Sequence, residues 1–201
     1  SYTLNIDASI KKLNDIRKSM NNDLANDIKL SFNHFLIKIT SMALLHTPEV
    51  NTTWEVNKIH SYKSTDIGIA VAIDNGLITP IIRSVERKGL LEIRDETSDL
   101  IARAREKKLL PSEYQGGTIS ISNLGSYGIK SFTSIINPPQ SSILSIGASR
   151  KVPVVLDDAI NIDELISITL TADHRLIDGA VGAKFIAYMK QLIENPNLML
   201  L

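Results

Sequence analysis

The order of hydrophobic patterns along the chain is the feature that most restricts its fold. Apolar residues at helical spacing come first, short strand-like runs follow, and one more helical segment ends the chain. The chain lacks the regular alternation of strands and helices that indicates a parallel α/β sheet. The order therefore predicts an α+β fold, with a mixed β-sheet flanked by helices, in one domain over residues 1–201.

Helices and strands are expected where the spacing of apolar residues changes from three or four to short continuous runs. Ser9 and Ser31 are the expected N-caps of the first two helices, which end near Asn22 and at Thr47. Two more helices are expected at 90–108 and 179–195. Strands are expected at 1–6, 66–73, 77–82, 118–122, 142–146, 152–156 and 164–172, with turns at Asp74-Asn75-Gly76 and Asp157-Asp158.

Charge and cysteine content exclude several classes of function. Lys plus Arg and Asp plus Glu number 22 each, so the chain has no net basic charge with which to bind nucleic acid or an anionic membrane. Cysteine is absent, which excludes an acyl-cysteine intermediate. No apolar run approaches the roughly 20 residues that span a bilayer. We therefore expect an intracellular, soluble chain with no nucleic-acid or membrane partner. Its start at Ser1 suggests a fragment of a longer protein.

His174 is the histidine whose surroundings indicate chemistry. It follows the strand expected at 164–172, at a turn before the last helix, and catalytic groups are common on such loops. On residue types alone, a structural loop histidine with Asp178 as an ordinary helix cap is the simpler interpretation. A metal site of His174 and Asp178 would lack an evident third ligand, so no metal is expected.

A glycine-rich segment at 116–128 supplies the second candidate. Ser122 lies at the end of the strand expected there, where its hydroxyl could donate a hydrogen bond to a developing oxyanion. The glycines match neither GxxxxGK[ST] nor GxGxxG, which excludes those nucleotide-binding loops. Ser126 does not lie in GxSxG, which argues against an α/β-type hydrolase.

Three motifs together resemble the catalytic domain of the dihydrolipoamide acyltransferases, the core subunits of 2-oxoacid dehydrogenase complexes. Residues 173–180 (DHRLIDGA) are similar to that family's DHRxxDGA signature, 116–125 (GGTISISNLG) to its GGTFTISNLG strand and 135–140 to its IINPPQ turn. The segment from Ser122 to Lys130 most resembles the acetyl-transferring, pyruvate dehydrogenase branch. The resemblance covers essentially the whole chain and implies a fold like that of chloramphenicol acetyltransferase.

The resemblance also implies a reaction, the exchange of an acetyl group between dihydrolipoamide and coenzyme A. His174 would be the general base and Ser122 the oxyanion donor, while Asp178 would pair with Arg17. The motifs also contain Asn123, Asp173, Arg175 and Gly179, without an assigned chemical role. Coenzyme A would be a substrate with unassigned contacts, and the lipoyl group would sit on a domain absent from this chain.

Family architecture implies a homotrimer in which His174 of one chain faces Ser122 of the next, assembled into a 24-mer or 60-mer core. The dehydrogenase and dihydrolipoamide dehydrogenase components would bind through missing domains, in a bacterial cytoplasm or a mitochondrial matrix. The apolar tail at 196–201 either docks in that assembly or folds back on its own domain. Ile119 and Ser126 depart from the family pattern beside the expected site.

Three alternatives stay open. The first is a catalytically silent scaffold, the second is the same chemistry with a branched-chain or succinyl group, and the third is an acyltransferase or hydrolase acting on a small hydroxyl compound.

Overall fold

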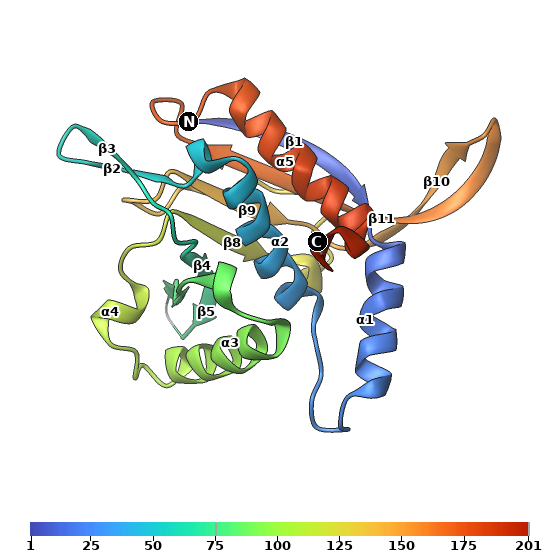
Figure 1. Cartoon of the computed structure of the whole chain (residues 1–201), viewed down its shortest axis with the longest axis horizontal. Helices are drawn as coiled ribbons and strands as arrows, with labels where there is room; N and C mark the ends of the chain where they lie inside the picture. The colour runs from blue at the N-terminus through green and yellow to red at the C-terminus, as the bar shows by residue number, and fades with distance from the viewer. Residues whose placement is uncertain (75, 201) are drawn as a thin grey trace.

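A twisted mixed sheet forms the centre of the molecule in the computed structural model, which describes residues 1–74 and 76–200 (Figure 1). Its strands are β1 (Tyr2–Ser9), β4 (Ile67–Ile69), β7 (Ile81–Ile82), β8 (Ile119–Asn123), β9 (Ser142–Ile146), β10 (Arg150–Leu156) and β11 (Ala159–Ala172). They are ordered β1-β11-β9-β8-β4-β7, and β10 pairs with β11. The strands β4, β8 and β9 are parallel and the other pairs are antiparallel, which confirms the predicted mixed sheet.

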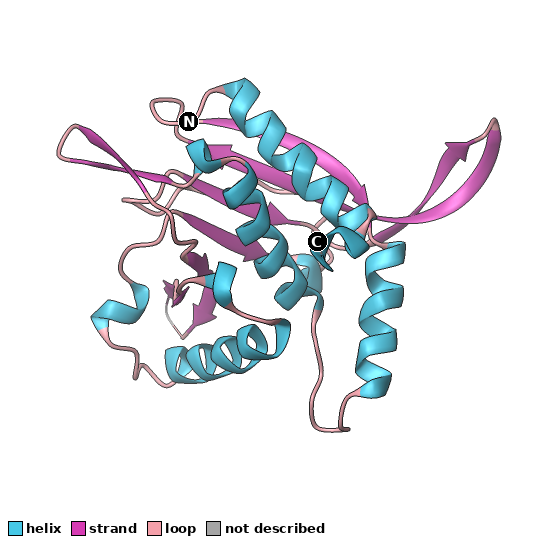
Figure 2. Cartoon of the chain, in the orientation of Figure 1, coloured by secondary structure: helices cyan, strands magenta, loops and turns pink. Residues whose placement is uncertain are grey.

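Helices lie over one face of this sheet and beside it, as Figure 2 shows. They are α1 (Lys11–Asp23), α2 (Phe32–His46), α3 (Leu90–Arg105), α4 (Pro111–Tyr114) and α5 (Gly179–Glu194). The helices α2 and α5 pack on each other and bury Phe35 and Phe185 completely. Strand residues such as Leu170 face the same core. The alternation of apolar and polar residues along the strands explains this arrangement, because successive side chains point to opposite faces.

The other sheet face carries small polar side chains. Ser145 and Thr169 are buried there, and an extended segment at 129–139 crosses them. The hydroxyls of Ser134 and Ser145 are 2.7 Å apart, and the amide of Ala148 donates to the carbonyl of Ile129. The segment containing the IINPPQ turn therefore satisfies part of this polar face without forming a strand.

The four main predicted helices are present, and one predicted cap is wrong. Ser9 does not cap α1, because it continues β1 opposite Leu165 and its hydroxyl donates to Asp163. The N-cap position of α1 is Ile10 instead. The surface helix α3 ends at Arg105, three residues earlier than predicted.

One hairpin of the structure is not predicted from the sequence, and another is more complex than predicted. The missed hairpin joins β2 (Thr52–Glu55) to β3 (Lys58–Ser61), so His60 lies in a strand. In the predicted hairpin at 66–82, β4 pairs with β7, and a smaller sheet joins β5 (Val71–Ile73) to β6 (Gly76–Ile78). Its predicted turn includes Asn75, which lies outside the described residues.

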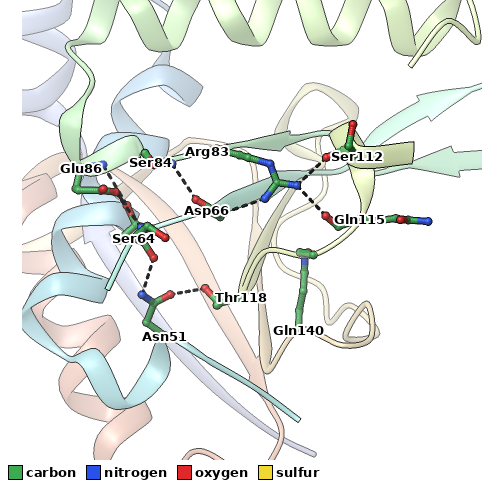
Figure 3. Close-up of polar contacts among 12 residues, drawn as sticks. Asn51, Ser64, Asp66, Arg83, Ser84, Glu86, Ser112, Gln115, Thr118 and Gln140 are labelled. Atoms are coloured by element: carbon green, nitrogen blue, oxygen red, sulfur yellow. Dashed lines mark hydrogen bonds and ion pairs between the residues drawn. The ribbon is translucent and has the colours of Figure 1, made fainter. Parts of the chain in front are cut away.

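A polar network braces the start of β8, at the end opposite Ser122 (Figure 3). The Thr118 hydroxyl donates to Asn51 over 2.6 Å, and the Asn51 amide donates to the carbonyl of Ser64 over 2.9 Å. Arg83 donates to Asp66 over 2.9 Å and also to two carbonyls in the 112–115 segment. These contacts hold the start of β8 to the residues just before β4. They also hold the 112–115 segment, which precedes β8, to Asp66 through Arg83.

Two surface features bear on assembly. The outer part of β10 and β11 projects from the body as a long hairpin (Figure 1). The second feature is the C-terminal tail. Leu198 and Met199 pack partly against the core while Leu200 is exposed, so the tail folds back in part. Within the described residues, no helix combines the length and apolar character needed to cross a membrane.

Candidate active site

The loop between β11 and α5 presents His174 at the surface. Its side chain is 61% exposed, and its Nδ1 lies 3.9 Å from Oδ1 of Asp178, whose side chain is 82% exposed. That separation exceeds a hydrogen bond. Asp178 occupies the N-cap position of α5, but its side chain makes no capping hydrogen bond. We call His174, Asp178 and the neighbouring Tyr2 the histidine half-site.

Asp173 and Arg175, the two neighbours of His174 in the loop, form an ion pair. The guanidinium of Arg175 donates to both carboxylate oxygens of Asp173, with Nη2 at 2.6 Å from Oδ2. Arg175 also lies 4.8 Å from the centroid of the Trp54 ring. The hydrogen bond from Arg175 lowers the pKa of Asp173 below its usual value, so the carboxylate stays ionised. Asp173 and Arg175 therefore shape the loop that carries His174.

Ser122 lies near the end of β8, where a cavity of about 290 Å³ reaches it. Ile37 and Ile101 line this cavity together with Ser122, and Arg105 also contributes to its lining. Among the described residues, the Ser122 hydroxyl has no recorded hydrogen-bond partner, which leaves it free to donate to a bound group.

Asn123 lines both this cavity and a second one of about 340 Å³, which Arg17 also lines. Its Nδ2 donates to Oδ1 of Asn33 over 2.7 Å, and its Oδ1 accepts from the amide of Gly125 over 2.8 Å. Both ends of the amide are therefore used, which fixes its orientation. We call Ser122, Asn123 and Arg17 the serine half-site.

The two half-sites lie at opposite ends of the sheet. Ser122 is level with Ser145 of β9, which is level with Thr169 of β11. Ala172 lies three residues further along β11, about 10 Å beyond Ser122, and His174 follows it. Two strand spacings of about 4.8 Å each separate the strands sideways. His174 and Ser122 of one chain therefore do not meet.

The expected partners Arg17 and Asp178 are separated in the same way. Tyr2, at the start of β1, contacts Asp178, whereas α1 with Arg17 follows the far end of β1. Within the chain, Arg17 donates to Asn14 over 3.4 Å. The pairing of Arg17 with Asp178 is thus not made inside one chain. Gly179 begins α5 and faces open space, so nothing near it requires a glycine.

Three residues beside these half-sites escaped the sequence analysis, namely Tyr2, Asn33 and Trp54. Tyr2 and Trp54 contact the histidine loop, and Asn33 contacts Asn123. Their partners lie at least 90 positions away along the chain, so local patterns carry no signal for these contacts. Trp54 is the sole tryptophan of the sequence, and this rarity was the one available indication of a role near the site.

Comparison with known proteins identifies close relatives over the whole chain. Residues 1–201 match the family described as 2-oxoacid dehydrogenases acyltransferase (catalytic domain). The chain is 48% identical over 202 residues to the dihydrolipoyllysine-residue acetyltransferase component of the pyruvate dehydrogenase complex of Rickettsia bellii, and covers 48% of that protein. It is 43% identical over 206 residues to the mitochondrial protein of the same name from Neurospora crassa, covering 100% of this chain and 45% of that protein. The chain therefore spans about half the length of the curated relatives it matches.

Solved structures give the same result for the fold. The cubic core of a pyruvate dehydrogenase multienzyme complex matches with a TM-score of 0.95 at 30% identity, over 100% of this chain and 84% of that chain. The Azotobacter vinelandii dihydrolipoamide acetyltransferase matches with the same four values. A chloramphenicol acetyltransferase matches with a TM-score of 0.64 at 15% identity, over 96% of this chain and 87% of that one. This last likeness concerns the fold alone and confirms the fold expected from the sequence.

Proposed function

Because the chain belongs to the family of 2-oxoacid dehydrogenase acyltransferase catalytic domains, we propose that it exchanges an acetyl group between dihydrolipoamide and coenzyme A. Both acceptors are thiols, so the reaction is a thioester exchange. The relatives are acetyltransferase components of pyruvate dehydrogenase complexes, which favours acetyl over a branched-chain or succinyl group.

The residue spacing of the Azotobacter enzyme carries this proposal. Crystallographic and enzymatic work on that enzyme addressed the role of a serine, a histidine and an asparagine in its catalytic mechanism. The serine precedes the histidine there by as many residues as Ser122 precedes His174 here, and the asparagine occupies the position of Asp178. The two chains differ at this third position, because Asp178 carries a charge where the other enzyme has an amide.

The chemistry of these side chains suits thioester exchange. A thiol is mostly protonated at neutral pH, and the His174 imidazole removes its proton as general base. The thiolate sulfur then attacks the thioester carbonyl, and the Ser122 hydroxyl donates a hydrogen bond to the resulting oxyanion. When the tetrahedral intermediate collapses, the second sulfur leaves and takes the proton back from the imidazolium. No acyl-enzyme is needed.

A shared site between chains follows from the separation of the two half-sites. We propose a homotrimer in which the histidine half-site of one chain meets the serine half-site of the next. In that arrangement Arg17 and Asp178 also come together across the interface, and Asp178 would gain a guanidinium partner. The cubic core of the related complex supports further assembly of such trimers into a 24-mer, with a 60-mer as the alternative.

The remaining components of the proposal lie outside this chain. The lipoyl group and the binding sites for the dehydrogenase components would be carried by further domains of the full protein. Its location would be the cytoplasm of a bacterium or the mitochondrial matrix, since the relatives include bacterial proteins and one named mitochondrial.

The test is the rate of acetyl transfer from acetyl-coenzyme A to dihydrolipoamide by purified trimers. His174→Ala should lower kcat by about a hundredfold to ten-thousandfold, the range for loss of a general base. His60→Ala, at an exposed histidine in β3, is the matched control and should keep the wild-type rate. Equal background rates for wild type and His174→Ala would reject the enzyme and favour the silent scaffold. Acetylation of small alcohols without transfer to dihydrolipoamide would favour the hydroxyl-directed alternative.

A further inference from the structure

Tyr2 is the side chain packed directly against His174. The centroids of the two rings are 4.7 Å apart and the ring planes are tilted by 53°. The Tyr2 hydroxyl donates a hydrogen bond of 3.0 Å to the backbone carbonyl of Asp178. One side chain therefore contacts both the proposed general base, His174, and the backbone of Asp178 at the end of its loop. Figure 1 shows the start of β1 beside this loop.

The sheet register explains how Tyr2 reaches this position. Tyr2 pairs with Ala172, the last residue of β11, so the two side chains leave the sheet on the same face. That face is covered by α5, whose first residues follow the histidine loop. The strand thus aims the tyrosine at the junction between the loop and the helix.

Gly182 in the first turns of α5 makes room for the Tyr2 hydroxyl. A Cβ atom added at Gly182 would lie 2.5 Å from that oxygen, which is too close for any real contact. The next neighbours are methyl groups of Leu170 and Leu4 at 3.3 Å, which need shift by only a few tenths of an ångström. Glycine in a helix interior is less favourable than alanine. Accommodation of the Tyr2 hydroxyl offsets that cost.

The hydroxyl stays protonated and available as a donor. Burial, and then the nearby charge of Asp178, raise the pKa of Tyr2 above its usual value of 10.0. The hydrogen bond to the Asp178 carbonyl therefore persists at any pH at which the enzyme would work.

We propose that Tyr2 is a positioning residue for His174. Its ring limits the rotamers of the imidazole, and its hydroxyl fixes the first turn of α5 and thereby the end of the loop. This inference rests on the proposed function, in which His174 is the general base. A misplacement of about 1 Å can lower a rate about a hundredfold, so a loop this exposed gains from an anchor.

Two variants at Tyr2 separate the role of the ring from that of the hydroxyl. Tyr2→Leu removes both and should lower kcat about tenfold or more without changing KM for coenzyme A. Tyr2→Phe keeps the ring and should recover most of that loss. Tyr114→Leu is the matched control, because this tyrosine is also half-buried but lies in α4 and lines neither cavity. It should keep the wild-type kcat.

Gly182→Ala supplies an independent test of the same contact. In the wild-type background the new methyl group displaces the Tyr2 hydroxyl and should lower kcat. In the Tyr2→Phe background the same substitution should have no further effect, because the oxygen that it would strike is gone. Additive losses in the double variant would show that Gly182 does not act through Tyr2.

A readout without turnover distinguishes failure of this inference from failure of the proposed function. Diethyl pyrocarbonate modifies accessible imidazoles, and mass spectrometry of the peptide containing His174 gives its rate of modification. In intact trimers, Tyr2→Leu should raise that rate several-fold while Tyr2→Phe leaves it unchanged. A wild-type protein without acetyl transfer, but with this pattern of modification, would reject the function and keep the positioning role. An unchanged modification rate and kcat in Tyr2→Leu would reject the positioning role.

Discussion

At the scale of single residues, Ser122 combines a free hydroxyl with a fixed backbone. Its strand is held at one end by the Thr118 network and at the other by the amide of Asn123. Such preorganised donors stabilise a developing oxyanion without reorganisation during the reaction.

Ser122→Ala should therefore lower kcat about a hundredfold to a thousandfold and leave KM for coenzyme A unchanged. The fold should survive, because no hydrogen bond of this hydroxyl is recorded among the described residues. Steady-state kinetics of the assembled protein checks this expectation. Ser98→Ala, which removes an exposed hydroxyl from α3, should retain full activity. A wild-type kcat in Ser122→Ala would remove the oxyanion role.

The site residues named from motifs and those found only from contacts in the structure differ in how the sequence encodes them. His174 and Ser122 could be named as candidates from the sequence because they stand in short segments whose residue order is itself informative. Tyr2 could not, since its partner Asp178 is 176 positions away and only the pairing of β1 with β11 joins them. The separation of the half-sites likewise follows from strand order, which no local pattern encodes.

At the scale of elements, the start of α2 depends on a titratable cap. The Ser31 amide donates to Nδ1 of His34 over 3.1 Å, in the position that glutamate or glutamine takes in a capping box. Burial, and then the nearby charge of Arg94, lower the pKa of His34 below its usual 6.5. The folded protein thus keeps this imidazole neutral, as its role as acceptor requires.

The cap should make stability depend on pH. His34 costs no stability above about pH 6.5, where it is neutral in both states. As the pH falls below that value, His34 becomes protonated in the unfolded chain but stays neutral in the folded chain. The stability of the folded chain therefore decreases until the pH passes the lower pKa of His34 in the folded state. His34→Gln keeps an acceptor that does not titrate, and the melting temperature should fall less between pH 7.5 and 5.5 than in the wild type. Thermal unfolding at the two pH values measures this difference, and parallel losses would contradict it.

Helices were easier to predict than the small sheets. The helix α2 has apolar residues at every turn and a serine before it, and both its ends were predicted to within one residue. The β2–β3 hairpin was missed because every side chain of β3 is exposed, so no alternation marks it. Ser9 was assigned as a cap because serine favours that position, but pairing of β1 with β11 extends the strand through it.

At the scale of the whole molecule, the projecting hairpin exposes a cluster of apolar side chains on one of its faces. Val155 pairs with Ile160 and Pro153 with Ile162, so these four side chains share a face. Val155, Ile160 and Ile162 are between 72% and 80% exposed in the single chain. Apolar surface of this kind favours an interface, which here would be with another copy of the chain.

Ile160→Asp should therefore shift the trimer towards monomers, because it buries a charge in that interface. Sedimentation velocity or mass photometry would show the smaller species, and acetyl transfer should be lost with it. Asn161→Asp adds the same charge one residue away, on the opposite face of the hairpin, and should leave the assembly intact. Intact trimers of Ile160→Asp would exclude this face from the interface.

Mixed trimers give the most direct test of a site shared between chains. A chain with Ser122→Ala keeps a working histidine half-site, and a chain with His174→Ala keeps a working serine half-site. Equal random mixing, by co-expression, places the two intact half-sites together at about one quarter of the interfaces in closed trimers. Activity should therefore rise from the background of either variant alone to about a quarter of the wild-type value. If both residues acted within one chain, every chain would lack one of them and mixing would restore nothing. The sheet keeps Ser122 and His174 at its opposite ends, so restoration is the expected result.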